Sequence, residues 1–62
     1  MDLNKKERHY VIQEFLDVLS CNLIGGGEIT LDNYKNFTVD DFTNIKTKDF
    51  EIMISIIDKL RM

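Results

Sequence analysis

The C-terminal stretch from Thr47 to Leu60 constrains the fold most, because it carries more apolar side chains than an ordinary surface helix needs. Its apolar positions are Phe50, Ile52, Met53, Ile54, Ile56, Ile57 and Leu60. At about 100° per residue they spread over an arc of roughly 200°, about twice the width of the usual apolar stripe. We therefore expect this helix either to be surrounded by the rest of the chain or to share a face with another molecule.

A second amphipathic helix is predicted over residues 4–23, where the apolar side chains fall within roughly 160° of one another. Asn4 is the expected N-cap, and Glu7 completes a capping box three residues later. The glycines at 25–27 should end this helix, because glycine readily adopts the left-handed conformation that closes a last turn. They also let the chain reverse, so that the two long helices can pack against each other.

Residues 28–46 are open to two interpretations. In the helical one, Thr30 caps a short helix that carries Leu31, Tyr34 and Phe37. Thr38 then caps a second with Val39, Phe42 and Ile45, with Asp41 completing its capping box, and Thr47 caps the final helix. In the other, residues 28–31 and 37–39 form a β-hairpin across a turn rich in Asp and Asn. The regular spacing of the three threonines favours the helical interpretation.

These patterns predict an all-α fold for residues 1–62, taken as a single small domain. We expect a small antiparallel helical hairpin with one or two short helices in the connection. The alternative is an α-β-β-α arrangement with a short hairpin.

Composition narrows the class of protein. The 62 residues are 44% hydrophobic and 31% charged, which is typical of a globular chain. The formal net charge of −3 argues against a nucleic-acid partner, because such proteins use basic surfaces to neutralise phosphate. A single cysteine precludes an internal disulfide, and no apolar run is long enough for a membrane span. Because residues 1–10 are polar, no signal peptide is expected. A cytoplasmic protein without a membrane partner is expected.

The segment N-L-I-G-G-G-E-I-T-L-D-N-Y, residues 22–34, resembles an EF-hand loop, with Gly27 at the required glycine and Ile29 at the central hydrophobic position. The resemblance would imply calcium binding, but side-chain oxygens are missing where ligands are needed. Ile24 and Gly26 occupy ligand positions, and Asn33 replaces the bidentate glutamate. We therefore expect no metal, and the glycines are not followed by the lysine that a phosphate-binding loop requires.

No arrangement of residues suggests catalysis or a cofactor. His9 and Cys21 lie about three turns apart on one predicted helix, so they cannot act as a pair within one chain. His9 is expected at the surface and Cys21 as a small packed residue. Asp40 and Asp41 are explained by their place at a helix start, where the helix dipole favours acids. The protein is therefore expected not to be an enzyme.

The run Lys5-Lys6-Glu7-Arg8-His9 is the one basic cluster, and it lies at a helix N-terminus, where positive charge is mildly unfavourable. It hints at an acidic partner or a nucleic-acid backbone, although a solvated helix end is the better explanation. A helix-turn-helix over residues 30–45 is the alternative function. Its recognition helix would carry Asp40 and Asp41 but no Arg or Lys, which would repel DNA.

The surplus of apolar side chains is what suggests a function. Besides the last helix, the aromatics Tyr10, Tyr34, Phe37 and Phe42 add more than one small core needs. A contiguous exposed apolar patch usually marks a protein interface. We therefore expect a small non-enzymatic interaction protein, such as a bacterial or phage inhibitor, antirepressor or adaptor, that binds a larger protein or forms a homodimer. The predicted contact residues lie on the outer edge of the last helix: Phe50, Met53, Ile54 and Ile57.

Overall fold

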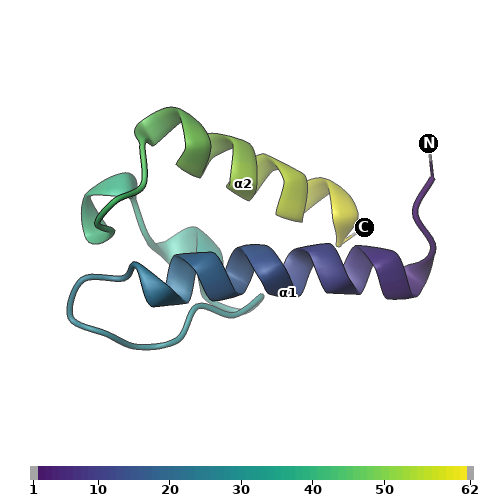
Figure 1. Ribbon diagram of the computed structural model, residues 1–62, viewed down its shortest axis with the longest axis horizontal. Coiled ribbons are helices and arrows are strands. Elements are labelled where there is room, and N and C mark those ends of the chain that lie inside the picture. Colours follow the sequence, from purple (N-terminus) through teal and green to yellow (C-terminus); the bar gives the residue numbers. More distant parts are fainter. Residues whose placement is uncertain (1, 62) are drawn as a thin grey trace.

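The computed structural model describes residues 2–61, which form two antiparallel helices joined by an irregular connection (Figure 1). The helices are α1, Lys5–Cys21, and α2, Thr47–Leu60, and the connection contains two 3₁₀ turns, η1, Tyr34–Asn36, and η2, Val39–Asp41. The predicted all-α hairpin is confirmed. Among the described residues there is no strand, and the α-β-β-α alternative is not formed; an isolated antiparallel bridge joins Leu23 to Phe42 instead.

Local sequence explains both ends of α1. The side chain of Asn4 accepts a hydrogen bond from the Glu7 amide at 2.8 Å, and the Glu7 carboxylate accepts one from the Asn4 amide at 2.9 Å. This capping box is the predicted one. Beyond the helix, residues 25–27 all have positive φ, between 80° and 115°, which confirms the expected reversal at the glycines. At Gly27, with φ of 115°, a side chain would also meet Leu23 at 3.3 Å.

The other predicted caps are partly wrong. Lys46, not Thr47, is the N-cap of α2, and its side chain makes no capping hydrogen bond within the described chain. Thr38 and Asp41 do form a capping box, but it opens a turn of only three residues. The predicted helix to Ile45 ends early because Phe42 is extended, with φ −121° and ψ 156°, and buries its ring against Phe37 and Phe50.

The helix predicted over residues 31–37 is also shorter than expected. The Thr30 hydroxyl accepts a hydrogen bond from the Asp32 amide at 3.2 Å, so it closes a local turn. The side-chain oxygen of Asn33 accepts a hydrogen bond from the Thr30 amide at 2.7 Å. Such local side-chain bonds compete with the helical ladder, and only the single turn η1 follows them.

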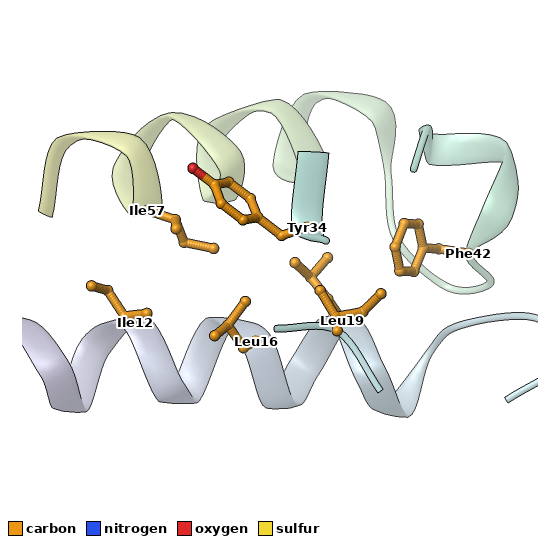
Figure 2. Packing of buried hydrophobic residues seen from close by; sticks show 7 residues of the cluster. Ile12, Leu16, Leu19, Tyr34, Phe42 and Ile57 are labelled. Atoms are coloured by element: carbon orange, nitrogen blue, oxygen red, sulfur yellow. The ribbon is translucent and has the colours of Figure 1, made fainter. Parts of the chain in front are cut away.

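The core lies between the two helices, and side chains from the connection complete it. Figure 2 shows Ile12, Leu16 and Leu19 pointing from α1 toward α2 and the connection. The buried apolar residues are Ile12, Leu16, Leu19, Ile29, Tyr34, Phe42 and Ile57. The connection therefore supplies nearly half of the buried set, which explains how so short a chain builds a core.

The connection packs along one flank of the hairpin. On α1, the Ser20 hydroxyl accepts a hydrogen bond from the Ile29 amide at 2.8 Å and donates one to the Leu16 carbonyl at 2.8 Å. On α2, the buried Tyr34 donates its hydroxyl hydrogen to Asp58. Both helices are thus held from the same side.

Candidate functional site

The four predicted contact residues do not form an outer edge of α2. Ile57 has no exposed surface and belongs to the core, so its expected place on the outside is wrong. Phe50, Met53 and Ile54 are half-buried and pack against that core. The structure brings these side chains together, but it directs them mostly inward. Whether any of them touches a partner stays a prediction.

The exposed apolar side chains of α2 lie on a different flank. Taking Ile57 as the direction of the core, 100° per residue places Ile54 about 60° and Asp58 about 100° to one side. This is the side on which Tyr34 contacts α2. Ile56 and Ile52 lie about 100° and 140° to the other side. Ile52 is 47% exposed, and Ile56 is half-buried without belonging to the core cluster.

Helix α1 repeats this asymmetry. With Ile12 as the direction of the core, Ser20 lies about 80° toward the side that contacts Ile29. Val11 and Val18 lie about 100° to 120° in the opposite direction. Val18 is 42% exposed and Val11 is half-buried.

The two uncovered flanks lie on the same side of the hairpin. In both helices the angle is counted in the direction of increasing residue number, starting from the residue that faces the partner helix. In an antiparallel pair of right-handed helices, positions with the same sign of this angle lie on the same side of the pair. The contacts of the connection with Ser20 and Asp58 agree with this geometry. We call the uncovered side the open face. It consists of Val11 and Val18 on α1 and Ile52 and Ile56 on α2, and the half-buried Phe15 and Met53, which also pack against the core, lie at its inner edge.

The open face is compact. From Val11 to Val18 the distance along α1 is about 10 Å, and neighbouring helix axes lie about 8–10 Å apart. Its apolar area is therefore on the order of a few hundred Å², a size that is often functional on a small protein. This is the scale of the apolar centre of an interface, which a polar rim would complete.

The aromatic surplus is smaller than the composition suggested. Tyr34 and Phe42 are 2% and 7% exposed, so both are core residues. Phe37 packs edge-on against Phe42, with ring centroids 6.1 Å apart, and is half-buried. Among these aromatics only Tyr10 is largely exposed, at 66%.

The titratable groups around Tyr34 link the connection to the end of α2. The hydrogen bond from Tyr34 is the main reason that the pKa of the Asp58 carboxyl lies below its ordinary value. Lys35 lowers this pKa further through an ion pair at 3.2 Å, while desolvation of the carboxyl opposes both. Arg61 donates to the Tyr34 hydroxyl at 3.1 Å and lies over its ring, 5.5 Å from the centroid. No local pattern predicts this role for Tyr34, because its partner lies 24 residues away.

The predictions for His9 and Cys21 have different outcomes. His9 is exposed, as expected, but Cys21 is exposed rather than packed. Within residues 2–61, no three His, Cys, Asp or Glu side chains gather as a metal site would require. No helix in the same range is long and apolar enough to cross a membrane.

Comparisons with known proteins add no relative. No protein-family profile matches the chain, and neither a curated protein nor a solved structure matches it significantly.

Proposed function

We propose that this protein is a non-enzymatic interaction protein that acts by occupying a surface of a larger protein, as inhibitors, antirepressors and adaptors do. The observation that carries the proposal is the open face, where both helices expose apolar side chains that the connection does not cover. Val18 and Ile52 are each more than 40% exposed there. A contiguous apolar surface of this kind favours association with another protein.

The partner we propose contributes an apolar strip, such as one face of an amphipathic helix. Such a helix fits a shallow two-helix surface by laying its apolar side chains along it. The exposed thiol of Cys21 has no disulfide partner in a chain with one cysteine, which suits the reducing cytoplasm.

No observation favours DNA binding as a second function. The residues expected in a recognition helix form a turn of only three residues, and that turn carries Asp40 and Asp41. Negative charge on so short an element would repel phosphate rather than bind it.

The substitution Ile52→Glu tests the proposal, with Ile24→Glu as the matched control. Both isoleucines are exposed, at 47% and 62%, and both changes introduce the same charge. Ile24 lies beyond the end of α1, next to the glycines, and outside the open face. Circular dichroism should first show that both variants keep the helical content of the wild type.

Each protein is then used as bait in an extract of the source organism, and its own mass is measured by sedimentation equilibrium from micromolar to millimolar. We expect a partner that the wild type and Ile24→Glu capture and Ile52→Glu does not. The proposal is wrong if Ile52→Glu captures the same proteins as the wild type. It is also wrong if the wild type is a dimer that only Ile52→Glu dissociates, because the open face then serves self-association.

A further inference from the structure

We propose a second binding site, a basic groove at the end of the hairpin where α1 begins and α2 ends, that takes an acidic peptide segment with an apolar anchor side chain. The groove has a volume of about 530 Å³. The groove is lined by the apolar side chains of Ile12, Leu31 and Leu60, which we call its floor, and by cationic side chains from the start of α1 and from Arg61, which we call its walls. It is distinct from the open face, and neither proposal depends on the other.

The groove arises because α1 extends past the end of α2 (Figure 1). The core-facing stripe of α1 contains Ile12, Leu16 and Leu19, and it continues backward at the helical spacing through Arg8 and Lys5. The stripe therefore changes from apolar to cationic where α2 no longer covers it. Arg8 is half-buried, and Lys5, Lys6 and His9 are exposed.

Among residues 2–61, the side chains that line the groove include cations and no acid. Lys5, Lys6, Arg8 and Arg61 make up four of the eight Lys and Arg residues in a chain of net charge −3. Glu7 is the one acid in this part of α1, and its carboxylate is engaged by the Asn4 amide in the capping box. No side-chain carboxylate from residues 2–61 forms an ion pair with these four cations.

Arg61 is held in place by the fold. It donates a hydrogen bond to the buried Tyr34 at 3.1 Å and stacks over its ring. A guanidinium oriented in this way, with further N–H groups to offer, suits a carboxylate. The site therefore combines an ordered cation with flexible lysines.

These features define the chemistry of the occupant. A volume of about 530 Å³ lies in the range of clefts that enclose a sizeable organic group, so a bare inorganic anion would leave the apolar floor uncovered. An apolar side chain on the floor and carboxylates against the walls match the groove. Single-stranded nucleic acid would need aromatic platforms for its bases, and the lining that residues 2–61 provide has none apart from His9. A lipid surface is flat, whereas the groove is concave and suits a projecting side chain.

A titration of the isotopically labelled protein tests this site. The probe is a short peptide of glutamate and aspartate with one central leucine, added to millimolar concentration while amide chemical shifts are recorded. We expect the largest shifts at the residues that line the groove, and binding that weakens as salt is raised through the physiological range. A peptide with serine in place of the leucine should bind more weakly, because it cannot cover the floor.

The double variant Lys5→Glu/Lys6→Glu should weaken binding on the order of tenfold, because it reverses two charges on the wall. The matched control is Lys46→Glu/Lys48→Glu, which makes the same changes at the start of α2 and should bind like the wild type. Both pairs lie at helix N-termini, where glutamate is favourable, so neither variant should unfold. Ile52→Glu should also bind the peptide normally, which separates this site from the open face.

Three results would overturn the proposal. The first is binding outside the groove, seen as chemical-shift changes elsewhere or as equal weakening by the two double variants. The second is equal affinity for the leucine and serine peptides, which would leave only a charge effect. The third is tighter binding, through the same residues, of an oligothymidylate or of vesicles containing phosphatidylserine, which would assign the groove to a different anion.

Discussion

The packing of α2 predicts that two isoleucines five residues apart differ sharply in their contribution to stability. Ile57 has no exposed surface, whereas Ile52 is 47% exposed on the open face. Replacing each with alanine removes the same atoms, Cγ1, Cγ2 and Cδ1. Both positions lie inside α2, so the helix propensity of alanine changes both variants equally.

The magnitudes follow from burial. At about 0.8 kcal/mol per buried methylene, the lost carbons of Ile57 account for roughly 2.4 kcal/mol, and the cavity they leave raises the cost to about 3 kcal/mol. Ile52 buries only about half as much and leaves no enclosed cavity. The better helix propensity of alanine offsets part of its loss, so we expect a cost of about 1 kcal/mol.

Urea denaturation followed by circular dichroism measures both costs. A domain of 62 residues is expected to have a free energy of unfolding of about 3–9 kcal/mol, so Ile57→Ala should lose a large part of it. The slope of that free energy against urea should stay the same, because the surface exposed on unfolding hardly changes. Equal costs for the two substitutions would refute the assignment of Ile57 to the core and of Ile52 to the open face.

Three further predictions concern the helix start, the glycines and the polar cluster. Because Lys46 leaves the N-terminus of α2 without a side-chain cap, Lys46→Ser should raise the free energy of unfolding by about 0.5–1 kcal/mol, measured by urea denaturation. An unchanged free energy of unfolding would contradict this account. Gly27→Ala should cost about 2 kcal/mol in the same assay, because φ is 115° and the new carbon would meet Leu23; a neutral substitution would argue against this backbone. Tyr34→Phe removes the hydrogen bond that lowers the pKa of Asp58. A carboxyl with a lowered folded-state pKa stabilises the fold above its ordinary pKa and loses that effect as the pH falls through the folded-state value. The stability difference between wild type and Tyr34→Phe, measured by urea denaturation, should therefore be full at neutral pH and shrink below about pH 4; a difference independent of pH would exclude the role of Asp58.

Much of the backbone could be predicted because its determinants are local. The capping box of Asn4 and Glu7 involves residues three apart, and the glycine reversal depends on the φ angles of the glycines themselves. The apolar periodicity placed α2 correctly, apart from its N-cap, which lies one residue earlier than predicted. In contrast, the short helices expected in the connection became single turns. Phe42 is extended and not helical, and its ring is buried in the core. Local sequence patterns do not predict such a contact.

The exposed side of the candidate site could not be predicted from the sequence. The amino-acid sequence specifies two long helices, a reversal at the glycines and an α2 with apolar side chains on both flanks. It could not decide which flank stays exposed, because local periodicity is the same on either side. The exposed flank is set by tertiary contacts, because the connection covers the other flank through the hydrogen bonds of Ile29 to Ser20 and of Tyr34 to Asp58. Ile54 was covered and Ile52 left exposed, since burial depends on contacts between residues far apart in the chain.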